Sequence, residues 1–354
     1  MSEKKRELKE IADKVNTQTR VSKGDIKTLF DHASDEELRR LSSSVKSRYH
    51  SLNSATYLKM AIVNYTNVCV AMCDYCSFYK LPHQEGTYLL STDEVCKKID
   101  ELVAFGGTEV AFNGGFHPKL KIDDYANLFA AIHKRYPDLG FKEMTVAEFM
   151  FACKNSKISY DEGAKRLKAV GTQWVTGGGA EILTDSFRDR HSPGKYKVED
   201  YYSAQKSILD SGMGSTATMV IGFDETLDER IEHLDRLRRF QDETNNGLKS
   251  FLCWSYKPYG NKLGGKEIDT REYLRWLAVS RIFLDNILHI RTSVLTKNEK
   301  ALDGLLYGAD DFDLPTEDEV TQKAGATVSH EFEKVLNYAK ELSIEPVYRR
   351  PFAL

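Results

Sequence analysis

The chain has 354 residues, of which 41% are hydrophobic, so it is long enough to bury one large core or two smaller ones. Its net charge is −3 and basic side chains are interspersed with acidic ones, which argues against the basic stripe of a nucleic-acid-binding protein. The first residues are charged and no apolar stretch reaches the roughly 20 residues that cross a bilayer, so we expect a cytosolic protein with no membrane partner.

The first 50 residues show helical periodicity in short pieces. Ser22 and Ser34 each stand three residues before an acidic side chain, Asp25 and Glu37, in the pattern of a capping box at a helix start. We therefore expect a helical cap or lid over residues 1–50, followed by a main domain over residues 51–354.

After this segment, short β-type runs alternate with amphipathic helical stretches. The eight predicted strands are Leu58–Thr66, Glu109–Asn113, Phe141–Val146, Gln173–Thr176, Ser215–Gly222, Lys249–Ser255, Ile290–Leu295 and a short one at Asp311–Asp313. The predicted helices include Ser91–Phe105, Ile122–Tyr136, Tyr160–Val170, Val198–Ser211, Thr226–Thr244 and Thr270–Asn286. Eight such units with right-handed crossovers close into an α/β fold, the (β/α)8 barrel of the TIM type; an open doubly wound sheet is the alternative.

Polar and glycine residues follow the predicted strands, as at Asn64, Asn113, Glu148, Gly177 and Gly222. In a barrel the carboxyl ends of all strands converge on one mouth, where active sites lie. This placement favours the barrel over the open sheet.

Three of the six cysteines, Cys69, Cys73 and Cys76, follow the first predicted strand directly. Four cysteines close the [4Fe–4S] cluster of an electron-transfer ferredoxin. Three leave one iron open to a small chelating molecule, such as S-adenosylmethionine with its amino and carboxylate groups. The spacing therefore predicts an enzyme with a [4Fe–4S] cluster.

Other interpretations of these three cysteines remain open. A disulfide framework belongs to short secreted chains. A structural zinc site needs a fourth ligand, for which His83 lies close in the sequence, and would make the chain a zinc-stabilised binding barrel with no redox role. Buried thiols without a ligand role are the third interpretation. Cys96, Cys153 and Cys253 lie in apolar or helical stretches, and we expect them in the core.

Glycine-rich sequences follow three of the predicted strands. Gly114 and Gly115 remove side-chain bulk where an amino acid ligand would approach the backbone, although an ordinary turn fits equally well. The triple glycine that begins at Gly177 is costly in conformational entropy, so we expect something large against it. Gly222 ends the fifth strand, where an adenine ring would lie close.

Several side chains near strand ends are candidates for binding or proton transfer. Arg188, Arg190 and His191 form a basic group in a predicted loop, suited either to a substrate carboxylate or to a solvated surface. His117 lies in a loop after the second strand and suits ligand contact, proton transfer or simple capping. Tyr75, between the second and third cysteines, is placed near the expected cluster.

Together, the cysteine spacing, the glycines and the predicted barrel resemble the radical S-adenosylmethionine superfamily. Within it, the sequences Asn64–Cys69, Gly114–Pro118, Gly177–Leu183 and Thr216–Met219 are similar to those of the futalosine-pathway enzymes of menaquinone biosynthesis. That group contains dehypoxanthine futalosine cyclase, aminofutalosine synthase and the related deazaflavin cofactor synthases.

The details of the resemblance favour one branch without excluding the others. The residues that lead into Cys69 are most similar to the cyclase. Asn113 and Phe223 depart from the pattern expected there, and the run Met144–Glu148 is closer to the synthase branch. A related enzyme with a different substrate therefore remains open.

The resemblance implies radical chemistry on a small-molecule substrate. An external one-electron reductant of the flavodoxin or ferredoxin type would supply the electron that cleaves S-adenosylmethionine to methionine and a 5′-deoxyadenosyl radical. In the cyclase, that radical takes a hydrogen from the substrate ribose, and the sugar radical closes onto the benzoate ring. The oligomeric state stays open.

The resemblance also implies roles for individual residues. The implied sites are the cluster on Cys69, Cys73 and Cys76; S-adenosylmethionine at Tyr75, Gly114, Gly115 and Glu225; the substrate carboxylate at Arg188, His191 and Arg291; and the base or ribose contacts at His117, Tyr65, Glu148 and Glu181.

Overall fold

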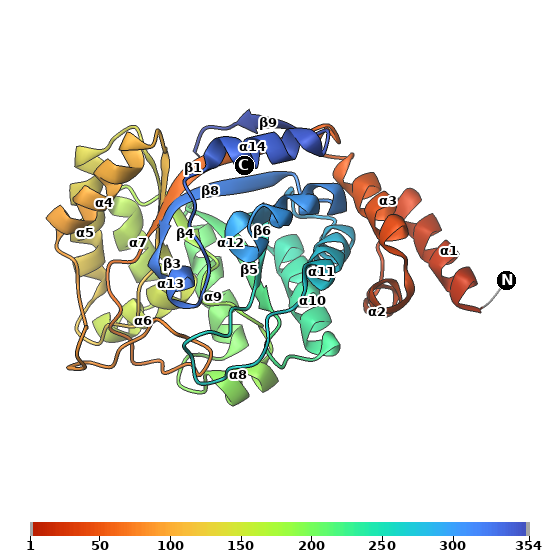
Figure 1. Ribbon diagram of the computed structural model, residues 1–354. Coiled ribbons are helices and arrows are strands. Elements are labelled where there is room, and N and C mark those ends of the chain that lie inside the picture. Colours follow the sequence, from red (N-terminus) through yellow and green to blue (C-terminus); the bar gives the residue numbers. More distant parts are fainter. Residues whose placement is uncertain (1–2, 352–354) are drawn as a thin grey trace.

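The computed structural model describes residues 3–351 and confirms the barrel (Figure 1). Eight parallel strands follow one another around it, and β1 closes the ring by pairing with both β8 and β2. The strands are β1 (Ser54–Val63), β2 (Glu109–Phe112), β3 (Gly140–Thr145), β4 (Trp174–Thr176), β5 (Gly214–Ile221), β6 (Leu248–Ser255), β7 (His289–Ser293) and β8 (Asp311–Asp318).

All eight predicted strands are present, but β8 is longer than expected. It ends at Asp318 rather than Asp313. Pro315 interrupts the β-type pattern of the sequence, and the structure accommodates it at an irregularity where the pairing with β1 shifts register beside Met60. A ninth strand, β9 (Glu345–Tyr348), was not predicted and pairs with the beginning of β1.

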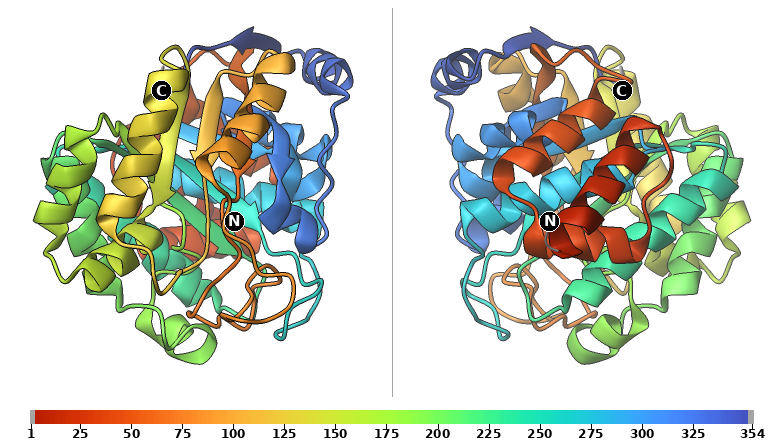
Figure 2. Two further views of the ribbon diagram at one scale, coloured as in Figure 1. Left: turned by 90° about the vertical axis from the view of Figure 1, so that its left-hand side faces the viewer. Right: turned by 90° about the vertical axis from the view of Figure 1, so that its right-hand side faces the viewer.

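Helices surround the barrel on all sides (Figure 2). They are α4 (Thr92–Ala104), α5 (Ile122–Arg135), α6 (Val146–Ser156), α7 (Tyr160–Ala169), α8 (Asp185–His191), α9 (Val198–Asp210), α10 (Leu227–Glu243), α11 (Thr270–Phe283), α12 (Val294–Lys297), the 3-10 helix η1 (Lys300–Tyr307), α13 (Glu319–Lys323) and α14 (Phe332–Glu341).

Two helices correct the sequence analysis. The segment predicted as a loop with Arg188 and His191 forms α8, which Thr184 caps through its side chain. Val146, predicted to end the third strand, begins α6, because Thr145 and Glu148 form a capping box directly after β3. In each case a polar cap residue starts a helix that the flanking pattern did not show.

Three further helices precede the barrel: α1 (Glu3–Asn16), α2 (Lys23–His32) and α3 (Asp35–Lys46). The capping boxes at Ser22 and Ser34 are confirmed. The helices lie against α10, α11 and η1 on the flank of the barrel (Figure 1), where Arg275 Nη1 donates to Asp35 at 2.6 Å. The domain division at residue 50 stays a prediction, and residues 1–2 and 352–354 of the two predicted domains lie outside the described residues.

Among the described residues, most of the core is one large cluster of apolar side chains from the strands and the helices around them, and two small clusters lie apart from it, one at the cysteine loop and one on β1 and β2. Cys96, Cys153 and Cys253 are buried, as expected. In the described part of the chain, no helix combines the length and the apolar character that a membrane crossing requires.

Charged side chains occupy part of the barrel interior. Lys142 Nζ donates to Glu109 Oε1 at 2.6 Å, and Arg291 Nε donates to Asp311 Oδ1 at 2.5 Å. Arg349, which follows β9, reaches in and donates to Asp311 Oδ2 at 2.6 Å. All five side chains are buried, so each charge is held by an opposite one.

Candidate active site

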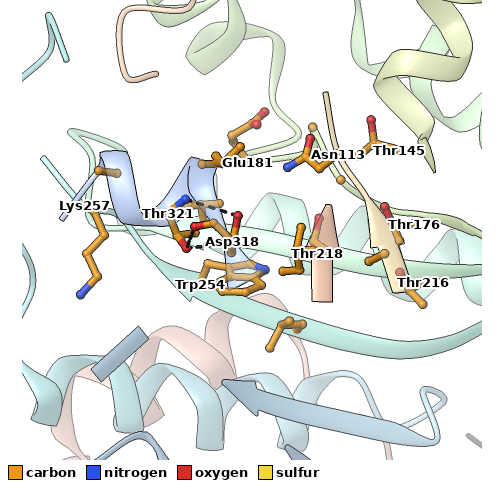
Figure 3. A pocket seen from close by; sticks show the side chains of 18 of the residues that line it. Asn113, Thr145, Thr176, Glu181, Thr216, Thr218, Trp254, Lys257, Asp318 and Thr321 are labelled. Atoms are coloured by element: carbon orange, nitrogen blue, oxygen red, sulfur yellow. Dashed lines mark hydrogen bonds between the residues drawn. The ribbon is translucent and has the colours of Figure 1, made fainter. Parts of the chain in front are cut away.

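A cavity of about 310 Å³ lies at the carboxyl ends of the strands and reaches into the barrel (Figure 3). Its lining begins at Met60, so none of the described residues of α1–α3 contributes to it. Ligand pockets typically measure roughly 300–1,000 Å³. The cavity therefore suits a small organic ligand.

Short polar side chains surround the cavity where the strands end. Thr145 closes β3, Thr176 closes β4, and Thr216 and Thr218 come from β5, with Asn113 directly after β2 (Figure 3). Thr218 Oγ1 donates to the carbonyl oxygen of Gly177, the first residue of the triple glycine, at 2.6 Å. Hydroxyl and amide groups on several strands suit a ligand that carries many hydroxyl groups.

One wall of the cavity is aromatic. Tyr75, Phe223 and Tyr256 form this wall, and Trp254 also lines the cavity. The ring centroids of Tyr75 and Phe223 are 5.2 Å apart, and those of Phe223 and Tyr256 are 4.4 Å apart. Such a wall offers flat apolar surface on which a heterocycle or an aryl ring stacks.

The loop that carries Cys69, Cys73 and Cys76 lies beside this wall, and Cys76 lines the cavity. The amide of Cys69 donates to the carbonyl of Lys80 at 2.9 Å, and the amide of Asp74 donates to the carbonyl of His191 at 3.1 Å. Burial raises the pKa of the Cys69 thiol and raises that of Cys76 to about 11. The backbone of the loop is thus held in place, and a bound cation would stabilise the thiolate forms of these buried thiols.

The spacing of the thiols fits a metal cluster better than a single ion. Among the described residues, only His50, His289 and Asp310 place three potential ligand atoms within 4.8 Å of one another. At bond lengths near 2.3 Å, the sulfur ligands of one zinc ion lie roughly 3.8 Å apart. The sulfur atoms of Cys69, Cys73 and Cys76 do not all lie within 4.8 Å of one another, so they are spread more widely than the ligands of one zinc ion. Beside Cys76, the buried Ser77 hydroxyl has no hydrogen-bond partner. This donor set suits a [4Fe–4S] cluster with a ligand next to it.

Tyr65 and Glu148, predicted as base or ribose contacts, lie behind the cavity and do not line it. Tyr65 is 1% exposed and its hydroxyl donates to Glu148. The amide of Gly114 also donates to Glu148, at 2.9 Å. This arrangement connects the end of β1, the loop after β2 and the start of α6.

Glu181 lines the cavity, and Arg188 lies behind it. Arg188 Nη1 and Lys195 Nζ each donate to Glu181 Oε2 at 3.0 Å. Burial opposes ionisation of Glu181, but Lys195 and Arg188 hold its pKa below the usual value. The Arg188 guanidinium therefore faces a protein carboxylate, and its predicted substrate contact has no direct support in the structure.

His191 lies between two loops outside the cavity lining. Its Nδ1 lies 3.0 Å from Asp74 Oδ2 on the cysteine loop, and its Nε2 lies 2.6 Å from Asp224 Oδ1 after β5. The side chain is 5% exposed. The imidazole thus connects the cysteine loop to the loop after β5.

The predicted glycines are required by the protein's own packing. A Cβ at Gly114 would lie 2.7 Å from the Tyr65 ring, and one at Gly115 would lie 2.3 Å from the carbonyl oxygen of Val68. A Cβ at Gly177 would lie 2.2 Å from the carbonyl oxygen of Thr216. The large groups against these glycines are thus neighbouring parts of the chain.

Three other predicted residues have different surroundings. Glu225 accepts from the amide of Gly222 at 2.8 Å and from Arg230, so it closes the turn after β5. His117 accepts at Nδ1 from the amide of Lys119 at 3.3 Å, which fits capping. Arg291 does line the cavity, with its guanidinium bonded to Asp311 and Asp313.

The sequence analysis missed several cavity residues: Trp254, Lys257, Asp318 and Thr321. Trp254 lies near the end of a correctly predicted strand, so its position there was a usable signal. Asp318 and Thr321 were missed because β8 was predicted to end at Asp313.

Two family models match adjacent parts of the chain. The one described as "Radical SAM superfamily" matches residues 63–237, and the one described as "CofH/MqnC C-terminal region" matches residues 245–351. Among solved structures, methylornithine synthase has a TM-score of 0.72 at 15% identity, over 95% of this chain and 97% of that one. The hydrogenase maturase HydG from Carboxydothermus hydrogenoformans has a TM-score of 0.73 at 16% identity, over 97% of this chain and 79% of its own. These two show a shared fold.

Curated relatives are closer in sequence. A cyclic dehypoxanthine futalosine synthase of Halalkalibacterium halodurans is 35% identical over 93% of this chain and 90% of its own length. An aminodeoxyfutalosine synthase of Thermus thermophilus is 35% identical over 79% and 76%. A 5-amino-6-(D-ribitylamino)uracil–L-tyrosine 4-hydroxyphenyl transferase of Methanococcoides burtonii is 32% identical over 82% and 83%. The chain therefore belongs to the radical S-adenosylmethionine superfamily, within the group of the futalosine-pathway enzymes.

Proposed function

We propose that this enzyme converts dehypoxanthine futalosine to cyclic dehypoxanthine futalosine. The observation that carries the proposal is the 35% identity to a cyclic dehypoxanthine futalosine synthase over 93% of the chain. Aminodeoxyfutalosine synthesis is the second candidate, because the Thermus thermophilus relative is equally similar over a shorter part of the chain.

Cys69, Cys73 and Cys76 hold the [4Fe–4S] cluster in this proposal. When bound, the cluster and S-adenosylmethionine supply a 5′-deoxyadenosyl radical, with the electron coming from an external flavodoxin- or ferredoxin-type reductant. Tyr75 and Ser77 flank Cys76 on the cavity side and contact the bound S-adenosylmethionine. The unpartnered Ser77 hydroxyl is then a hydrogen-bond donor to it.

The substrate carries a ribose and a benzoate, and the cavity offers groups for both. The threonine hydroxyls of β3, β4 and β5 bind the sugar hydroxyls. Lys142 and Arg291 line the cavity toward the barrel interior, which Arg188 does not, and we assign the benzoate carboxylate to that end. Both cations also bond to protein carboxylates, so they are held in fixed positions.

The remaining task of the protein is containment. A primary alkyl radical attacks almost any nearby C–H bond, so selectivity depends on holding one ribose hydrogen close and excluding water. The aromatic wall of Tyr75, Phe223 and Tyr256, together with Trp254, supplies apolar surface that excludes water. Glu181, which Arg188 and Lys195 hold in place, contacts the cofactor or the ribose from the loop after β4.

The test is mass spectrometry of anaerobically reconstituted protein with S-adenosylmethionine, dithionite and dehypoxanthine futalosine. We expect 5′-deoxyadenosine and a product two hydrogens lighter than the substrate. Cleavage of S-adenosylmethionine without loss of the substrate would contradict the cyclase. A covalent adduct of the adenosyl group with an enolpyruvyl benzoate would instead identify the synthase.

A further inference from the structure

Asp318 is a buried carboxyl group in the cavity, and the proposed function assigns it no role. It ends β8, lines the cavity and is 2% exposed. Its Oδ2 accepts from the Thr321 hydroxyl at 2.7 Å, a bond drawn in Figure 3. The residue was not singled out by its sequence context, because the strand that places it was predicted to be shorter.

The partners of Asp318 distinguish it from the other carboxylates in the cavity. Glu181 is bonded to two cations, and Asp313 is bonded to Arg291. Within the described chain, Asp318 has no Lys, Arg or His within ion-pair distance, and its donors are the Thr321 hydroxyl and backbone amides. A buried carboxyl group with neutral donors alone is poorly stabilised as an anion.

The charged groups around Asp318 are engaged elsewhere. On its own segment, Glu317 bonds to Lys98 and Glu319 accepts from the Tyr88 hydroxyl. Lys257, which lines the same cavity, bonds to Glu267 at 2.6 Å. Burial raises the pKa of Asp318 to about 7, although the bonds from Thr321 oppose this. At neutral pH the group therefore exists in both protonation states, which suits an acid–base catalyst.

We propose that Asp318 accepts the proton that the benzoate ring loses during ring closure. This rests on the proposed function. When the sugar radical bonds to the ring, the attacked carbon still carries its hydrogen. That C–H bond breaks, the proton moves to an Asp318 oxygen, and the electron pair joins the five π electrons of the ring radical, which then holds one electron more than an aromatic sextet. This extra electron leaves to a one-electron acceptor, an oxidised iron–sulfur centre, and the ring becomes aromatic again.

The test separates hydrogen abstraction from ring closure. In Asp318→Asn, single-turnover assays should show 5′-deoxyadenosine at close to the wild-type rate, while the cyclised product falls by about 10²-fold or more, the usual contribution of a general base. Asparagine is also a good N-cap, so the start of α13 is preserved. Glu317→Gln is the matched control, because Glu317 is the neighbouring carboxylate and does not line the cavity.

Each outcome bears on the proposal. Unchanged amounts of cyclised product and 5′-deoxyadenosine in Asp318→Asn would overturn it. An equal loss of both products would also overturn it, because that result indicates a structural role. Wild-type protein that cleaves S-adenosylmethionine but leaves the substrate unchanged would overturn the proposed function itself, and the ring-closure role with it.

A second measurement does not depend on turnover. Infrared difference spectra of the holoenzyme without substrate should show two carboxyl bands that titrate near pH 7, from Asp318 and Glu148, and Asp318→Asn should lose one of them. Thr321→Val removes the hydroxyl donor, so the same band should titrate at higher pH. A wild-type spectrum identical to that of Asp318→Asn from about pH 5 to about pH 9 would contradict the proposal.

Discussion

Glu148 occupies a fully buried position in which hydrogen bonds from three elements meet. Oε1 accepts from the amide of Gly114 and from Tyr65, and Oε2 accepts from the hydroxyl of Thr145 at 2.6 Å. Burial raises the pKa of Glu148 to about 7, although these bonds act in the opposite direction. The residue therefore contributes to stability in a pH-dependent way.

The sign of that dependence follows from the two pKa values. The folded protein binds the Glu148 proton more tightly than the unfolded chain, in which the pKa is near 4.5. Stability is then lost as pH rises from about 4.5 to about 7. Because glutamine does not titrate, the free energy of unfolding of Glu148→Gln should rise by about 3 kcal/mol relative to that of the wild type as pH increases over this range. Urea unfolding at about pH 5 and about pH 8 measures it, and equal pH profiles would contradict the shift.

Gly115 offers a test of how closely the cysteine loop is packed. A Cβ there would lie 2.3 Å from the carbonyl oxygen of Val68 and 2.7 Å from Cys69 Cβ. Gly115→Ala should therefore displace Cys69 and lower the iron content after reconstitution several-fold, with the barrel still folded. Gly24→Ala is the control, because its Cβ would meet only the Ser22 hydroxyl, at 3.8 Å. Full iron loading of Gly115→Ala would show that the loop adapts.

At the scale of elements, His191 connects α8 to the cysteine loop. Its ring lies between Asp74 and Asp224, within 3.0 Å of each. His191→Ala should leave both carboxylates without this partner and loosen residues 69–76. Hydrogen exchange by mass spectrometry should then show faster exchange in that peptide, with little change in α4 or α11. Unchanged exchange would mean that the backbone bond from Asp74 to His191 is sufficient.

Individual elements were predictable where one signal dominates. Strands such as β5 and β6 are bounded by clear changes in the hydrophobic pattern. Ser22 and Ser34, each with an acidic residue three positions later, predicted the starts of α2 and α3. The failures have local causes. Pro315 interrupts the β-type sequence pattern, so β8 was predicted too short and Asp318 was missed. The helix α8 is short, begins at Asp185 after the cap residue Thr184, and has a polar sequence that resembled a loop.

Among the site residues, the structure supports the predictions unevenly. The placement of the cysteine loop at the mouth was predictable from the sequence, because a loop that follows a barrel strand lies at the carboxyl-terminal face of the barrel. The surroundings of Arg188 did not follow, because its partner Glu181 lies seven positions earlier across a turn. Charge alone does not tell whether an arginine faces a ligand or a protein carboxylate.

For the whole molecule, closure of the barrel was predictable from the alternation of strands and helices, but the charged layer inside it was not. Glu109, Lys142, Arg291, Asp311 and Arg349 come from parts of the chain that are far apart, and each looks like a surface residue in its own segment. Only the closed structure brings them together. Arg349 in particular depends on β9, which pairs with β1 outside the ring of eight strands.

Removal of Arg349 should therefore destabilise the whole barrel. Arg349 is 4% exposed and its Nε donates to Asp311 at 2.6 Å, so Arg349→Ala breaks a buried ion pair and should cost about 3–5 kcal/mol in urea unfolding. Arg350→Ala is the matched control. Arg350 is exposed, and its loss should change stability by no more than about 0.5 kcal/mol.

The effect of Arg349 should also depend on pH. Burial alone would raise the pKa of Asp311, but Arg291 and Arg349 hold it below the usual value. A lowered pKa contributes stability that is complete above the unfolded value, near 3.8, and is lost as pH falls below it. Without Arg349 the pKa of Asp311 rises, so the difference between Arg349→Ala and wild type should be largest near neutral pH and shrink below about pH 4. A difference that stays constant on acidification would mean that Arg349 stabilises the barrel through packing and not through its charge.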